Sequence, residues 1–231
     1  MKRIYLLLFI SFLINILSAQ PYKFLFRHYN IENGLNSNCI QDLLIDHKGF
    51  LWVATDNGLS KYDGVRFINY QKRNTHNRLG SNSILSLFED GTESLYIGTE
   101  NGLYLYDYTK GLFQFYSTQI HSSIYGIAKD KKGMLWITKS GEVIRINKDK
   151  SIKRFRLSTP NEVAYKIYID HTGKIWITTS NALYYFNNYK NKFEKFIINK
   201  KPNNIYSFAI CEDYLNNLWV GTWDGGLLKT N

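Results

Sequence analysis

The chain has 231 residues, of which 44% are hydrophobic, 16% aromatic and 21% charged. This apolar content is enough for a packed core in one or two domains, while 18 Tyr, 14 Phe and only 3 Pro favour strands and turns over helices. The net charge is +10, but the basic residues are scattered along the chain with Asp and Glu between them. The charge therefore gives no support to nucleic acid as a partner, and none is predicted.

The first twenty residues differ from the rest. Lys2 and Arg3 precede an apolar run over Ile4–Leu17, and the small residues Ser18-Ala19 follow it. This pattern is typical of a secretory signal peptide, so we expect residues 1–19 to be one and the protein to be exported, periplasmic or extracellular. Two alternatives stay open: a buried core helix, and an uncleaved anchor, which would be the protein's sole attachment to a membrane.

The two cysteines, Cys39 and Cys211, lie far apart in the chain, and no Cys/His pattern has the spacing of a zinc site. An exported protein can form disulfides, but this pair has no framework spacing, and we expect two buried free thiols. No metal site and no cofactor are predicted.

One string of residues recurs five times. Each copy contains an aliphatic segment, an Asp, a short turn, an apolar residue, an aromatic residue, an aliphatic residue, a small residue and usually a Thr. The aromatic residue always lies six positions after the Asp, and successive aromatic residues are 44, 40, 40 and 43 positions apart. The copies are Ile40–Thr55, Ile84–Thr99, Ile124–Thr138, Ala164–Thr179 and Ser207–Thr222. The pairs are Asp46 with Trp52, Asp90 with Tyr96, Asp130 with Trp136, Asp170 with Trp176, and Asp213 with Trp219.

Four short strands fit each repeat. In the first repeat they are predicted at Ile40–Ile45, Leu51–Ala54, Leu59–Tyr62 and Val65–Tyr70, separated by turns rich in Asp, Asn and Gly. A period of about 40 to 50 residues with four strands per unit is typical of β-propeller blades. We therefore predict an all-β fold, with a β-propeller segment over residues 20–231. Its repeats cover about 32–70, 79–116, 121–157, 161–198 and 203–231.

The repeated Asp and aromatic positions are interpreted as structural. A single four-stranded sheet cannot bury both faces, so neighbouring blades must stack. We expect each aromatic residue to fill the space between blades, contributing roughly 2–3 kcal/mol, and each Asp to cap backbone amides of the following turn. A packing solution is needed once per blade and an active site only once, so repetition argues against catalysis.

Ligand binding is expected on one face of the ring. Strand alternation places the turn between the second and third strands of each unit on the same face as the longer connections between units, and such loops commonly carry binding residues. We hypothesise that Trp223 stacks on a ligand, because the matching positions in the other units are acidic or Ser. Ordinary solvated turns are the alternative. The candidate ligand-binding residues are Arg73, His76, Arg78, Lys139, Trp223 and Asp224.

No catalytic constellation is found. The sequence has no Gly-rich phosphate loop, no nucleophile elbow, and no His that recurs beside a carboxylate outside the repeat turns. We therefore expect no enzyme. At the N-terminal side, Phe24–Asn30 is similar to a fourth strand, and the last unit ends at its third strand, so this segment is a candidate to complete the last blade and close the ring. An incomplete ring is the alternative.

Four segments carry a resemblance to a known family. They are IENGLNSN (31–38), DHKGFLWVATDNGLSKYDG (46–64), LGSNSI (79–84) and LWVGTWDGGL (218–227). With these segments the chain resembles the two-component regulator propeller family, whose members are typically exported sensor regions of Bacteroidetes hybrid histidine kinases, many responding to oligosaccharides. The resemblance implies a propeller, usually of seven blades, followed by a sandwich domain, a membrane span and kinase modules. This sequence has five units and no kinase modules, so we expect a truncated sensor without kinase activity.

The leading hypothesis is an extracytoplasmic propeller that recognises a carbohydrate or another small ligand and signals to partner domains. A propeller scaffold for protein–protein contacts or homodimerisation is the first alternative. A polysaccharide lyase or hydrolase is the second, and it would need a His/carboxylate or metal cluster that the sequence does not supply.

Overall fold

The computed structural model describes residues 25–72, 79–91, 94–159, 161–197, 206–223 and 225–230. The expected signal peptide, residues 1–19, lies outside these ranges. The described chain is almost entirely β-structure, with one short 3₁₀ helix, η1 (Ile31–Asn33). A search of these same ranges finds no helix long and apolar enough to cross a membrane.

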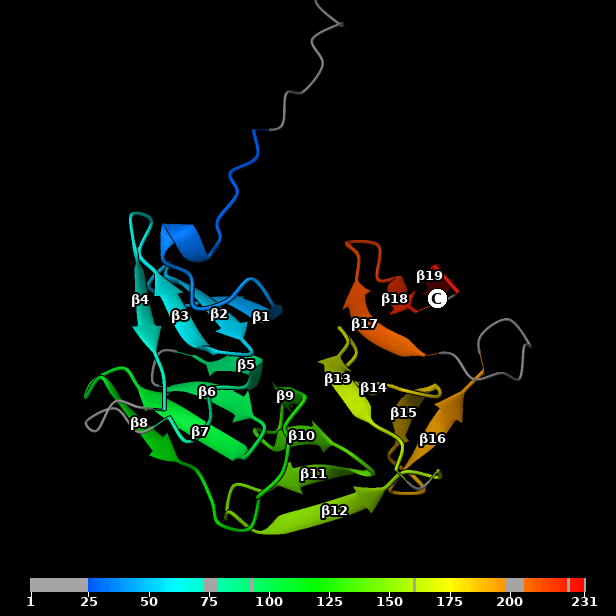
Figure 1. Cartoon of the computed structure of the whole chain (residues 1–231). Coiled ribbons are helices and arrows are strands. Elements are labelled where there is room, and N and C mark those ends of the chain that lie inside the picture. Colours follow the sequence, from blue (N-terminus) through cyan, green and yellow to red (C-terminus); the bar gives the residue numbers. More distant parts are fainter. Residues whose placement is uncertain are drawn as a thin grey trace, which may run out of the picture.

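The strands form five antiparallel sheets, each made of consecutive strands, which follow one another around a central axis as the blades of a propeller (Figure 1). The all-β propeller prediction is thus confirmed, although the fifth sheet has three strands within the described residues.

Blade 1 contains β1 (Ile40–Ile45), β2 (Leu51–Thr55), β3 (Gly58–Tyr62) and β4 (Phe67–Tyr70). Blade 2 contains β5 (Ile84–Asp90), β6 (Ser94–Thr99), β7 (Gly102–Asp107) and β8 (Leu112–Phe115). Blade 3 contains β9 (Gly126–Lys129), β10 (Leu135–Lys139), β11 (Glu142–Ile146) and β12 (Ile152–Arg156). Blade 4 contains β13 (Ala164–Ile169), β14 (Ile175–Thr179), β15 (Leu183–Asn187) and β16 (Lys192–Phe196). Blade 5 contains β17 (Ser207–Glu212), β18 (Leu218–Thr222) and β19 (Leu227–Thr230).

The strands predicted in the first repeat agree closely with blade 1, except at the fourth strand. β4 begins at Phe67, whereas the pattern predicted Val65. The reason is local: the Asp63 carboxylate accepts hydrogen bonds from the backbone N–H groups of Val65 and Arg66, both at 2.8 Å, and so holds these residues in the turn. Val65 is accordingly 88% exposed.

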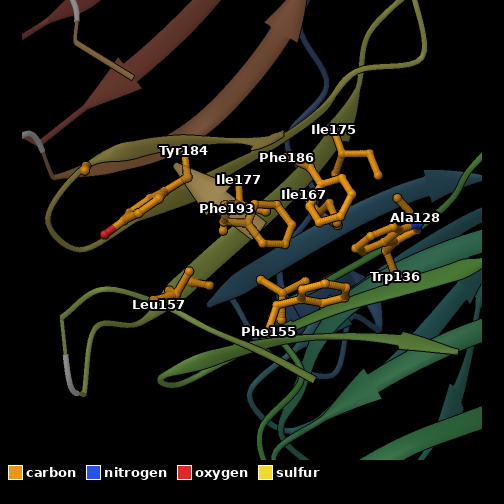
Figure 2. Packing of buried hydrophobic residues seen from close by; sticks show 13 residues of the cluster. Ala128, Trp136, Phe155, Leu157, Ile167, Ile175, Ile177, Tyr184, Phe186 and Phe193 are labelled. Atoms are coloured by element: carbon orange, nitrogen blue, oxygen red, sulfur yellow. The ribbon is translucent and has the colours of Figure 1, made fainter. Parts of the chain in front are cut away.

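The hydrophobic core is divided into four clusters, one between each pair of consecutive blades. Figure 2 shows the cluster between blades 3 and 4, where Trp136 and Phe155 of blade 3 face Phe186 and Phe193 of blade 4. The Trp136 and Phe155 rings are stacked at 5.5 Å, and Phe186 meets the Trp136 ring edge-on at 5.1 Å. Each blade therefore depends on its neighbours for burial, as expected of stacked repeats.

The segment before the first blade does not form the expected fourth strand. Residues 25–30 have no strand structure, and Phe24 lies outside the described ranges. Tyr29 instead packs on blade 1, where its hydroxyl lies 2.9 Å from that of Tyr62 and its ring lies 5.8 Å from Phe67. The ring closure predicted through this segment is therefore wrong for the described residues, because its side chains have partners on blade 1.

The prediction of two buried thiols is also wrong. Cys39 and Cys211 are both free, but both are exposed. Cys211 lies opposite Trp219 in the register of β17 and β18, on the face of blade 5 that points away from blade 4. No further described blade covers that face. Burial of a thiol at this position depends on a following blade.

Candidate functional site

One face of the ring carries the turns between second and third strands together with the connections between blades, as strand alternation requires. We call it the 2–3 face, and the opposite side the 1–2 face. On the 2–3 face, the turns hydrogen-bond to the connections through their backbones. Gly58 N–H donates to the Asn82 carbonyl at 2.6 Å, and Trp223 N–H donates to the Tyr206 carbonyl at 3.0 Å. The connections are thus held on the rigid blades.

The repeated Asp and Trp side chains form one unit on the 1–2 face. The Asp46 Oδ1 atom accepts hydrogen bonds from the Lys48 and Phe50 N–H groups at 2.9 Å, while Oδ2 accepts the Trp52 indole N–H at 2.8 Å. The same three bonds occur at Asp130, Asp170 and Asp213. The carboxylate therefore fixes both the turn and the ring that fills the next interface.

These hydrogen bonds also alter acidity. At Asp213 the indole N–H of Trp219 is the largest of the causes that lower the carboxyl pKa to about 2. At Asp170, burial acts to raise the pKa, but bonds from the Thr172 hydroxyl and the Trp176 indole outweigh it and the pKa is lowered. Both carboxylates are committed to structure. Blade 2 has Tyr96 in place of Trp, and there Asp90 instead forms an ion pair with Lys129 of blade 3.

Sequence reasoning assigned no role to the Thr that ends most copies of the repeat. Thr55 accepts a hydrogen bond from Asn57 N–H at 3.1 Å and donates one to the Gly58 carbonyl at 2.7 Å. Thr99 and Thr179 make the same pair of bonds. These hydroxyls fix the turn on the 2–3 face, so the loops there are preorganised.

Four aromatic side chains form a continuous row across blades 3, 4 and 5, which we call the aromatic row. Tyr125 precedes β9, Tyr165 is the second residue of β13, Phe208 is the second residue of β17, and Trp223 follows β18. Adjacent ring centroids are 6.1, 4.6 and 5.7 Å apart along the row. Burial is the largest cause of a raised pKa at Tyr165, with nearby Tyr206 contributing. First strands begin on the 2–3 face, so the row lies there, with ring surface open to solvent.

Trp223, the foremost ligand candidate from sequence, is at the end of this row and 79% exposed. Lys139 is held by an ion pair with Glu142 at 3.0 Å. Arg73, His76, Arg78 and Asp224 lie outside the described residues. The three other rings of the row were missed, although a signal was present: an aromatic residue occupies the second position in the third, fourth and fifth copies of the repeat.

An ion pair crosses the centre of the ring. Lys166 Nζ on β13 lies 3.0 Å from Asp42 Oδ1 on β1, and Asp42 Oδ2 accepts the Leu87 N–H of β5 at 2.9 Å. The pair therefore links blade 4 with blades 1 and 2 although these are not neighbours along the chain. Both side chains are partly buried, so the pair is less screened by water than one on the surface.

Glu162 provides a buried carboxylate near the row. It is 3% exposed and accepts the Tyr184 hydroxyl at 2.8 Å, and its other oxygen contacts the Thr179 hydroxyl oxygen. Burial is the largest cause that raises the pKa of Tyr184 to about 12. The described residues contain no group of three or more His, Cys, Asp or Glu side chains that could hold a metal ion.

The comparisons with known proteins agree with this geometry. The model of the family described as "Two component regulator propeller" matches residues 34–57 and 200–224, in the first and fifth repeats. The matched residues lie in two of the five blades. The resemblance to this family that the sequence predicted is thus confirmed.

One curated relative, a protein named histidine kinase P4 from Formosa agariphila, is 39% identical over 61 residues, which are 26% of this chain and 4% of that protein. Two solved extracellular domains of putative hybrid two component systems from B. thetaiotaomicron are similar in fold. One has a TM-score of 0.72 at 22% identity, covering 85% of this chain and 27% of the other. The second has a TM-score of 0.60 at 24% identity, covering 89% and 35%. The chain thus spans a small part of each of these proteins.

The fold is also shared with an enzyme. The virginiamycin B lyase of Staphylococcus aureus has a TM-score of 0.62 at 17% identity, covering 82% of this chain and 68% of that one. At such identities the likeness concerns the fold alone, so function must be argued from the residues.

Proposed function

We propose that this chain is an exported, ligand-sensing propeller of a two-component regulatory system. It recognises a carbohydrate or another small ligand on the 2–3 face and signals to partner domains, and it has no catalytic role of its own. The observation that carries the proposal is the aromatic row, in a chain whose first and fifth repeats match the two-component regulator propeller family.

The physical reason lies in the exposure of the row. Trp223 is 79% and Phe208 36% exposed, whereas the second-strand tryptophans of blades 1, 3 and 4 are buried between blades. Exposed rings on a rigid scaffold offer an apolar surface on which the faces of a sugar or another flat ligand can pack. The turn that carries Trp223 is preorganised, since its N–H bonds to the Tyr206 carbonyl and Thr222 donates to the Gly226 carbonyl. A rigid site lowers the entropy lost on binding.

The test is a glycan array followed by calorimetry, with the full chain purified after export. We expect at least one oligosaccharide to bind, and Trp223→Ala and Tyr165→Ala each to weaken it about tenfold or more, as for loss of a stacking ring. Tyr214→Ala is the matched control, because Tyr214 is 91% exposed on a turn of the 1–2 face and should leave binding unchanged. Absence of binding across the array, or equal binding by all three variants, would contradict the proposal.

A second candidate function, self-association, is favoured by the two end faces of the row of blades. At each internal interface a blade presents a second-strand ring to the next blade, as Trp52 does to blade 2. The corresponding Trp219 of blade 5 is partly exposed, and Leu227 beside it is 64% exposed. On the opposite end face, blade 1 exposes Leu43 by 58% and Ile45 by 70%. The exposed face of blade 5 is thus equivalent to the side of an internal interface that presents the ring, and the exposed face of blade 1 to the side that covers it. Blade 5 of one copy can therefore stack on blade 1 of a second copy.

Sedimentation equilibrium tests this second candidate. The chain should associate in a concentration-dependent way, and Leu43→Glu should shift it towards monomer. Leu112→Glu is the control, since Leu112 is 42% exposed on the outer strand β8, away from both end faces. A monomer at high concentration would exclude self-association and leave the ligand-sensing proposal untouched.

A further inference from the structure

A cavity of about 460 Å³ opens between blades 3 and 4 on the 1–2 face, opposite the aromatic row. It is lined by the first turn of blade 3, the matching turn of blade 4 and the end of β11. This volume is in the range of small-molecule sites, roughly 300–1,000 Å³. The cavity shares no residue with the row, so a ligand bound here does not depend on the proposed function.

Arg145 is the central group of the cavity. It lies on β11 opposite Trp136, and its guanidinium carbon is 5.5 Å from the centre of that ring and 5.8 Å from that of Phe155. Its Nε atom is buried and has no hydrogen-bond partner, and no described carboxylate lies within 4.0 Å of its guanidinium. The Arg145 guanidinium therefore lines the cavity without a described carboxylate to balance its charge, which leaves that charge open to an anion in the cavity.

The surroundings of Arg145 are basic. Lys131 and Lys132 also line the cavity, and Lys131 Nζ donates to the His171 carbonyl at 2.8 Å. Asp130 is the one carboxylate in the lining, and both its oxygens already accept hydrogen bonds from its own turn and from Trp136. The lining therefore holds three cationic side chains and one carboxylate, and that carboxylate already accepts hydrogen bonds within its own blade. This excess of positive charge favours an anion in the cavity.

The rest of the lining is apolar. Met134, Ile175 and Phe186 form a wall next to the cations, and Asn188 adds a side-chain amide at the rim. A guanidinium presents parallel N–H groups that match the oxygens of a carboxylate, sulfate or phosphate. We propose that this cavity binds a small organic molecule through such an oxoanion group, with Arg145 as the principal contact and the apolar wall against the remainder of the molecule.

A purely structural role for Arg145 is the competing explanation, because a cation lies over the second-strand ring in other blades too. Lys61 occupies the same position in blade 1, with Nζ 5.1 Å from the Trp52 ring and 3.7 Å from Phe50. Lys61→Gln is therefore the matched control for Arg145→Gln. Each variant removes one positive charge from above a tryptophan, but only the second removes the proposed contact.

The experiment is a titration of the full chain with sodium sulfate, sodium phosphate and sodium benzoate in turn, at an ionic strength kept constant with sodium chloride. The readout is the Nε–Hε cross-peak of each arginine in ¹H–¹⁵N correlation spectra, together with calorimetry. We expect a saturable shift of the Arg145 cross-peak with at least one anion, and which anion succeeds distinguishes carboxylate from sulfate and phosphate. Arg145→Gln should weaken binding by about tenfold or more, and Lys61→Gln should not change it.

Two results would overturn the proposal: the absence of a saturable shift with every anion, or equal affinities in Arg145→Gln and Lys61→Gln. If Arg145→Gln does not fold, the double variant Lys131→Gln/Lys132→Gln replaces it, since both lysines are exposed. Binding of anions should persist in Trp223→Ala, so failure here and failure of the proposed sensing site are separate outcomes.

Discussion

Replacing Trp52 with Ala tests how much of the stability comes from the contact between blades. Trp52 is completely buried, its ring lies 5.1 Å from Tyr106 of blade 2, and its indole N–H donates to Asp46. Removing a buried Trp side chain costs about 3–5 kcal/mol, from lost apolar burial and the cavity left behind. We expect a loss at the middle of this range, about 4 kcal/mol.

The matched variant is Trp219→Ala on blade 5. Trp219 makes the equivalent bond to Asp213 at 2.9 Å and lies under Lys229 at 5.5 Å, much as Trp52 lies under Lys61. Because no following described blade covers Trp219, its loss should cost only about 1–2 kcal/mol. The difference between the variants thus isolates the part contributed by the neighbouring blade.

Urea unfolding followed by far-UV circular dichroism measures both variants, at a concentration where the chain is monomeric. The m value is compared first, because repeat proteins can unfold blade by blade. Equal losses of stability in the two variants would refute the reasoning, since they would mean that the adjacent blade contributes nothing to the burial of Trp52.

Three further outcomes are expected. Gly98→Ala should destabilise the protein by about 2 kcal/mol in urea unfolding, because a Cβ there would lie 2.1 Å from the Ser86 hydroxyl. Gly221→Ala is at the same place in blade 5 and should be tolerated, because the nearest neighbour of its Cβ would be 3.5 Å away. Similar losses of stability in both variants would contradict this account of the packing. Glu89→Gln should lower the free energy of unfolding by about 1–2 kcal/mol, since this carboxylate accepts hydrogen bonds from the backbone N–H and ring of His47 and from the Tyr108 hydroxyl. An unchanged melting temperature would show that these hydrogen bonds do not contribute to stability. Because the pKa of Asp213 is lowered to about 2 from 3.8, its contribution is present above the unfolded-state pKa and is lost as the pH falls through about 2. Wild type should therefore lose its advantage over Asp213→Asn as acid is added from about pH 5 to pH 2, and a constant difference in urea midpoint would count against it.

Much of the fold could be predicted because the repeat is local. The first strand of blade 1 was predicted at its observed bounds, since alternation and flanking turn residues act over neighbouring positions. The bonds of Asp46 to its own turn and to Trp52 likewise span only six positions. The expected fourth strand at Phe24–Asn30 failed for a different reason: its pattern suited a strand, but Tyr29 finds its partners on blade 1.

The candidate sites could be predicted only in part. Trp223 was identified because it breaks the pattern of its repeat, but the other rings of the aromatic row could be connected to it only once three blades were placed side by side. Arg145 gave no signal in the sequence, because a cation opposite the second-strand ring also occurs at Lys61 as part of the repeat. Its buried, unpartnered Nε is a property of the space between blades.

The amino-acid sequence alone therefore determined most of the strands, the turns capped by Asp and the five repeats, because the pattern of each lies within one repeat of 40 to 44 positions. Only the tertiary structure decided which faces stay open, which rings form a row and which charges meet, as Lys166 meets Asp42 across the centre. The physical reason is that these contacts join different blades. Their energies depend on how the blades stack, which no single repeat encodes.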